Sequence, residues 1–142
     1  MARAAASGAE GRARLMRASE VQPQDILDAS AFLFVCPENL ASMSGEMKEM
    51  FDRCYYPVLG RIEGRAYATL IAAGSDGENA QRQIDRIATG WRLKRVADPI
   101  IVNLDAQTPE VILAAKTVPE ERLADCRALG SALGEGIALG IF

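Results

Sequence analysis

Two short apolar runs, each followed by a polar loop and an amphipathic helix, constrain the fold of this chain more than any other feature. The runs cover residues 31–35 and 66–73, and neither alternates cleanly with polar residues. Continuous apolar strands are typical of parallel sheets that are covered on both faces. We expect a third strand over residues 95–104, at a sheet edge, because Pro99 cannot donate to a ladder. A weaker strand is expected over residues 12–17.

Helical patterns separate these strands. Residues 44–55 place apolar side chains on one helix face, with Ser44 as N-cap, and Pro57 is expected to end this helix. Tyr55 and Tyr56 are expected to lie beyond it. A short helix is predicted near residues 24–28.

Two further helices follow the second apolar run. One is expected to open with a capping box at residues 75–78 and to bury a stripe of residues from Ala80 to Trp91. The last helix is expected to begin near Pro119, with Gly130 and Gly134 allowing a close approach to a neighbouring element. Strands alternating with helices predict an α/β fold, a doubly wound parallel sheet in three α/β/α layers. With 142 residues, the chain is expected to be one domain, residues 1–142.

Composition excludes several classes of function. The net charge is −3, which argues against a protein built to bind nucleic acid or an anionic membrane surface. The chain has no histidine, so it lacks the Ser-His-Asp and Cys-His nucleophile systems and the common zinc sites. Cys36, Cys54 and Cys126 are widely spaced, which indicates buried thiols of a cytoplasmic protein and predicts no metal site.

Two loops leave the carboxyl ends of the predicted strands, at residues 37–45 and 74–80. Ligands of open parallel sheets bind at this edge, and helix N-termini there offer N–H groups to carbonyl oxygens or anions. Either loop alone is also explained as a connection rich in turn residues.

The first loop carries a more specific pattern. It resembles the strand–loop–helix signature of the flavodoxin-like NAD(P)H-dependent FMN reductases, and the strand end followed by Gly74-Ser75-Asp76-Gly77 resembles the flavin-ring loop of that family. The resemblance spans residues 12–139. The matching residues of the first loop are Pro37, Glu38, Ser42, Gly45, Met47, Lys48, Phe51 and Asp52.

The resemblance implies a flavodoxin-like flavoprotein that binds FMN between the two loops. It also implies an oxidoreductase that transfers hydride from NAD(P)H through FMN to a quinone or another small acceptor. Homo-oligomers are compatible with it, and no catalytic side chain is assigned, because flavin carries the redox chemistry. The implied cofactor-binding residues are Pro37, Glu38, Asn39, Leu40, Ser42, Met43, Gly74, Ser75, Asp76 and Gly77.

The sequence departs from the family pattern in the first loop. Asn39 stands where the family has tyrosine, so Leu40 and Met43 are expected to supply the apolar contact to the ring. We expect Gly77→Val to lower FMN affinity by blocking backbone approach, without unfolding the domain.

The second departure concerns the amino-terminal end. Residues 1–10 look like the second half of the first helix of the family, and the first central strand and the phosphate loop have no counterpart. FMN binding is therefore expected to be weakened, and the strand at residues 31–35 is expected to have an open inner edge. An in-frame extension of about 20–25 residues would supply both elements.

A flavodoxin-like chain without its phosphate site could act as a flavin-free binding or assembly module. A phospho-acceptor receiver domain shares the sheet order, but Cys36-Pro37 ends the strand where that domain needs an aspartate.

Overall fold

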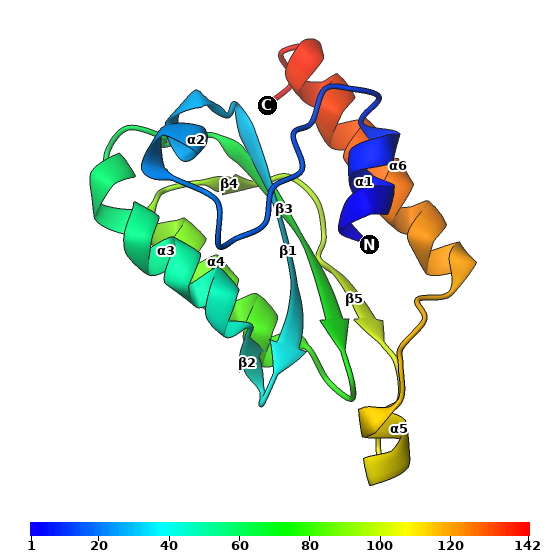
Figure 1. Ribbon diagram of the computed structural model, residues 1–142. Coiled ribbons are helices and arrows are strands. Elements are labelled where there is room, and N and C mark those ends of the chain that lie inside the picture. Colours follow the sequence, from blue (N-terminus) through cyan, green and yellow to red (C-terminus); the bar gives the residue numbers. More distant parts are fainter.

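A mostly parallel sheet lies between two layers of helices in the computed structural model, which describes residues 1–142 (Figure 1). The helices α3 and α4 cover one face, and α1 and α6 lie on the other. The elements in chain order are α1 (Ala2–Gly8), α2 (Pro23–Asp28), β1 (Ala31–Asn39), β2 (Ser42–Met43), α3 (Gly45–Val58), β3 (Ala66–Ala73), α4 (Glu78–Gly90), β4 (Lys94–Arg95), β5 (Ile100–Asn103), α5 (Pro109–Leu113) and α6 (Glu120–Ala138).

The central pairing of the sheet joins β1 and β3 in parallel, from Ala31 opposite Ala66 to Pro37 opposite Ala72. Both strands follow the predicted apolar runs, and β3 is buried along nearly its whole length. On the far side, β4 and β5 both pair with β3. The expected edge strand is thus confirmed but divided, and Pro99 lies in the gap between its two parts.

The other edge of β1 carries no strand over residues 31–37, as expected from the sequence. The strand expected at residues 12–17 is wrong, because this segment forms no ladder. Instead it helps to line a cavity of about 820 Å³ between the open edge of β1 and the helices α1 and α6. The lining is mainly apolar and includes Leu15, Leu33 and Leu133.

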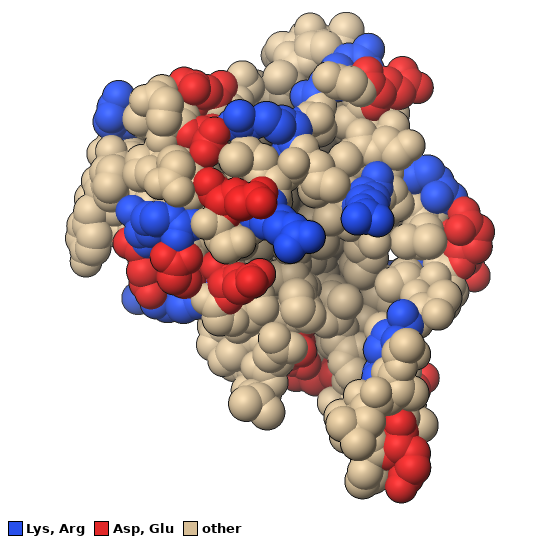
Figure 2. Space-filling view, viewed as in Figure 1, with Lys and Arg blue, Asp and Glu red and all other residues tan.

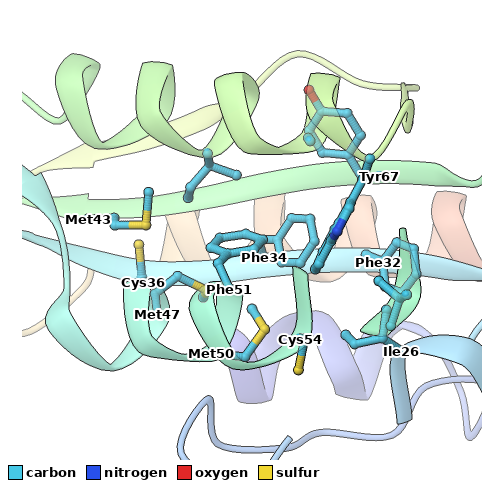
Figure 3. Packing of buried hydrophobic residues seen from close by; sticks show 14 of the residues in the cluster. Ile26, Phe32, Phe34, Cys36, Met43, Met47, Met50, Phe51, Cys54 and Tyr67 are labelled. Carbon is cyan, nitrogen blue, oxygen red and sulfur yellow. The ribbon is translucent and has the colours of Figure 1, made fainter. Parts of the chain in front are cut away.

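The main core lies between the sheet and helices α3 and α4. Phe34 of β1 packs against Phe51 of α3, with ring centroids 5.1 Å apart, and Phe51 packs against Trp91 at 5.4 Å. Figure 3 shows the rings of Phe34 and Phe51 beside sulfur-bearing side chains of β1, β2 and α3. The predicted apolar face of α3 is confirmed, since Met47, Met50, Phe51 and Cys54 are all buried.

A smaller contact joins α1 and α6 through glycine. A Cβ atom at Gly130 would lie 2.0 Å from the carbonyl oxygen of Ala5, and one at Gly8 would lie 2.0 Å from that of Arg127. The close approach expected for Gly130 is therefore confirmed. At Gly134 the nearest atom would be 3.5 Å away, which is ordinary contact.

Three details of the helices differ from the sequence predictions, and the third is the unpredicted short helix α5. Pro57 lies within the last turn of α3, where its missing N–H removes only one helical bond, so Tyr55 and Tyr56 belong to the helix. No capping box opens α4, because its N-cap is Gly77, which has no side chain. The short helix α5 was not predicted from the sequence. The short helix α1 agrees with the helical character expected of residues 1–10.

No helix of the chain is both long enough and apolar enough to cross a bilayer.

The burial of α3 yields a stability prediction. Met50 is 3% exposed, so Met50→Asp places an unpaired charge in the core and should lower the free energy of unfolding by about 3 kcal/mol or more. Tyr56→Asp on the same helix, where the side chain is 79% exposed, is the matched control. Urea titration of both variants measures the difference, and equal midpoints would contradict the burial of this face.

The cysteines yield a prediction on reactivity. Burial raises the pKa of the Cys36, Cys54 and Cys126 thiols, so less thiolate is present at a given pH than for an exposed cysteine. The folded protein should therefore react slowly with Ellman's reagent at neutral pH, and all three thiols should react once it is unfolded in urea. Rapid reaction of the folded protein, at the rate of free cysteine, would contradict this.

Candidate functional site

The two predicted loops meet at the carboxyl end of the sheet. Because β1 and β3 are adjacent and parallel, their ends lie side by side, and Pro37 is opposite Ala72. One carboxylate oxygen of Glu38, Oε2, accepts a hydrogen bond of 2.8 Å from the backbone N–H of Gly77. This contact joins residues that lie 39 positions apart in the sequence.

The first loop is a tight β-hairpin rather than an open connection. Residues Glu38 and Asn39 of β1 pair with Met43 and Ser42 of β2, which leaves Leu40 and Ala41 at the turn. Both turn residues have positive φ angles, 50° and 57°. Side chains with a Cβ atom pay roughly 1–2 kcal/mol each in this conformation, so the surrounding contacts must hold the turn.

Two amide side chains of α4 supply those contacts. Asn79 donates a 2.5 Å hydrogen bond to the carbonyl oxygen of Ala41. Gln83 accepts from the N–H of Met43 at 2.9 Å and donates to the hydroxyl of Ser42 at 3.1 Å. Sequence reasoning missed both residues, since two amides one helical turn apart look the same as any polar helix face.

The side chains of the first loop divide between core and surface. Leu40 is fully exposed at the tip of the hairpin, where it can contact a ligand. Met43 is 5% exposed and lies in the core beside Cys36, so the apolar contact that we expected of its side chain is not available (Figure 3). Pro37 and Asn39 are exposed, and Ser42 is half-buried.

In the second loop, backbone groups rather than side chains are presented. The N–H groups of Ser75 and Asp76 donate no hydrogen bond within the protein, and both residues are exposed. The Asn103 side chain donates to the Ser75 carbonyl oxygen at 2.7 Å and holds the loop. Gly74 is half-buried beside Ala106.

Gly77 has no room for a side chain. Its φ angle is 94°, and a Cβ atom there would lie 2.5 Å from Cγ2 of Ile101 and 3.1 Å from Cβ of Ala73. The expectation that Gly77→Val would leave the fold intact is therefore wrong. Glycine at this position is required by packing and by the left-handed backbone, in addition to any role in binding.

A basic groove of about 500 Å³ adjoins the hairpin between α3 and α4. Arg82 and Arg86 lie one helical turn apart on α4, are exposed, and form no ion pair. Lys48 of α3 also lines the groove and pairs with Asp52 at 2.5 Å, as expected of a solvated surface pair. Sequence reasoning missed the groove, because its cations come from two helices that the sequence alone does not place together.

The arrangement suits the polar edge of a flat heterocycle. It combines free N–H donors at residues 75 and 76 with a carboxylate acceptor at Glu38, and the exposed Leu40 side chain follows two residues later at the tip of the hairpin. In Figure 2 the surface at the lower end of the sheet, where the hairpin ends, is mainly uncharged, with acidic atoms beside it. The residues present therefore fit the ring of a flavin.

Comparison with solved structures shows the same fold. A flavodoxin from the domain Archaea is 15% identical, with a TM-score of 0.73, and the match covers 96% of this chain and 87% of that chain. An NADPH-quinone reductase from P. pentosaceus is 10% identical, with a TM-score of 0.61 over 90% of this chain and 87% of that chain. The flavodiiron protein from Giardia intestinalis is 18% identical, with a TM-score of 0.72, and this chain spans only 32% of its length. The predicted flavodoxin-like fold is therefore confirmed.

Comparison with protein families places the chain more closely. No curated protein matches the sequence. The family model of NADPH-dependent FMN reductase matches residues 19–106, which include both loops, the hairpin and all of α3 and α4. The chain therefore belongs to the NADPH-dependent FMN reductase family, and its general class of function is that of an FMN-dependent NAD(P)H oxidoreductase.

Proposed function

We propose that the chain binds the FMN ring between the hairpin and the loop at residues 74–77, and passes hydride equivalents from NAD(P)H to a quinone or another small acceptor. One observation carries the proposal: the Glu38–Gly77 hydrogen bond brings the two loops together at the carboxyl end of the sheet, in a chain of this family. When bound, the flavin would supply the redox chemistry.

The chain's own residues bind and orient the ring. The N–H groups of residues 75 and 76 would donate to its carbonyl oxygens, and the Leu40 side chain would cover part of its apolar face. Asn79 and Gln83 keep the hairpin in the conformation that presents Leu40. None of these binding and orienting contacts requires a histidine.

The basic groove supports an anionic electron donor. NAD(P)H carries phosphate groups, and two unpaired arginines beside Ser42 offer charge-assisted hydrogen bonds next to the proposed ring site. We propose that the phosphates of the donor bind Arg82 and Arg86.

A quinone, as the electron acceptor, fits the same carboxyl end of the sheet. Quinones are flat and largely apolar, and the exposed Leu40 side chain offers them a contact beside the ring site. A structural neighbour named as an NADPH-quinone reductase supports this choice of acceptor.

We also propose that the affinity for FMN is modest and that residues 1–142 act as one domain. None of these residues forms the Ser/Thr-rich phosphate loop that the resemblance implies, so the ring contacts supply most of the binding free energy. FMN and riboflavin should then bind this chain with similar affinities.

Reconstitution tests the proposed function. The purified chain is titrated with FMN, and binding is followed by quenching of flavin fluorescence. The loaded protein should oxidise NADPH and reduce a soluble benzoquinone above the rate of free FMN. Absence of binding at millimolar FMN would contradict the proposal and favour the flavin-free binding module.

A charge reversal tests the donor site. Arg86→Glu should raise KM for NADPH about tenfold, because it replaces an attractive contact with phosphate by a repulsive one, and should leave kcat nearly unchanged. Arg61→Glu is the matched control, since Arg61 is exposed and lies beyond the far end of α3 from Lys48. An equal KM for both variants would show that the phosphates of NADPH do not bind in this groove.

A further inference from the structure

Helix α5 and the residues that follow it form an apolar arm, residues 109–118, that stands away from the layers of the fold. Figures 1 and 2 show the arm projecting from the body of the protein beyond the end of β5. No residue of α5 is buried, and the side chain of Leu113 is 86% exposed beside exposed Val111 and Ile112. The N–H groups of residues 115–118 donate no hydrogen bond within the protein. Single exposed apolar side chains are common, but a contiguous run of them indicates an interaction surface.

The cavity beside β1 is a second feature without a partner. It measures about 820 Å³, its lining is mainly apolar, and Leu15 in its wall remains 51% exposed. The edge of β1 that faces it carries no strand over residues 31–37, so backbone N–H and C=O groups there have no ladder partners. A small apolar molecule would fill the volume but would leave these polar groups unpaired. A peptide segment with apolar side chains satisfies both requirements, as in recognition at the open edge of a sheet.

The arm has the chemistry that this cavity requires, but it does not occupy the cavity of its own chain. It offers aliphatic side chains from α5 and free backbone N–H groups from residues 115–118. None of its residues is among those that line the cavity. The arm projects outward instead, so a second copy of the chain is the partner that it can reach.

The charges of the two surfaces are opposite. Residues 12–17, which help to line the cavity, include three arginines and no acidic residue. Two of these arginines remain available, since only Arg14 forms a close ion pair. Residues 104–113, which lead into the arm and include α5, carry Asp105 and Glu110 and no basic residue. Complementary charge favours the association of these two surfaces and fixes its orientation.

We propose that two copies of the chain form a dimer in which the arm of each copy docks in the cavity of the other, beside the open edge of β1. A two-fold dimer makes this contact twice, because the arm of each copy meets the cavity of its partner. The exchange covers both arms and both open edges, so no unpaired edge is left to recruit further chains. The docking requires no flavin and goes beyond the proposed function.

The test measures the oligomeric state of the original chain and of three variants by sedimentation equilibrium. Leu113→Asp places a charge on the arm, and Leu15→Asp places one in the wall of the cavity. Both side chains are exposed in the single chain, so both variants should fold, which circular dichroism checks. Tyr56→Asp, at an exposed position of α3 outside both surfaces, is the matched control.

The original chain and Tyr56→Asp should form dimers with micromolar dissociation constants. Leu113→Asp and Leu15→Asp should each raise the dissociation constant about tenfold or more, because docking then buries a charge among apolar side chains. An equimolar mixture of these two variants should associate more tightly than either variant alone. In the mixed dimer, the unchanged arm of the Leu15→Asp copy meets the unchanged cavity of the Leu113→Asp copy, so one of the two contacts is restored.

Several results would overturn the exchange. An original chain that stays monomeric well above micromolar concentration does not use the arm in this way. If Leu113→Asp weakens the dimer and Leu15→Asp does not, the two arms pair with each other and the cavity has a different occupant. If neither variant changes the dissociation constant, the dimer uses another surface. If Leu15→Asp does not fold, Arg12→Glu replaces it as the cavity variant, since Arg12 is exposed on the same segment.

Discussion

The parallel pairing of β1 with β3 is the interaction on which the rest of this structure depends. Residues 31–37 pair in unbroken register with residues 66–72, and β3 then carries both β4 and β5 on its other side. The same register fixes where the two strands end, and so brings Glu38 within hydrogen-bonding distance of Gly77. A shift of one residue would turn the buried side chains of β1 to the opposite face and would separate the loops.

The sheet is supported unequally on its two sides. Toward α3 and α4, aromatic and sulfur-bearing side chains fill the space, and Phe51, Cys54 and Trp91 are 1% exposed or less. Toward α1 and α6, Leu33 and Leu133 remain half-buried, because they face the cavity beside the open edge of β1. Apolar surface that stays in contact with solvent contributes less to stability, so α3 and α4 supply most of the hydrophobic stabilisation.

The sequence predicted what depends on local pattern and missed what depends on distant partners. Apolar runs and helical spacing identified β1, β3, α3, α4 and α6, since each carries its own hydrophobic period. The hairpin was missed because Leu40-Ala41 lacks the Asn-Gly or Asp-Gly signal of a tight turn, and it is held by Asn79 and Gln83 from another element. The Pro57 prediction failed because a proline in the last turn removes only one helical bond. The loops themselves were identified, but their direct contact depends on a strand register that sequence alone does not fix.

The site combines features that each cost stability. Leu40 and Ala41 adopt left-handed backbone conformations, and Glu38 buries an oxygen atom without a donor. Both features lie at the carboxyl end of β1, where the fold is otherwise well paired. Backbone strain and buried polar atoms without partners occur most often at functional sites, so both features support the ring site proposed for this end of the sheet.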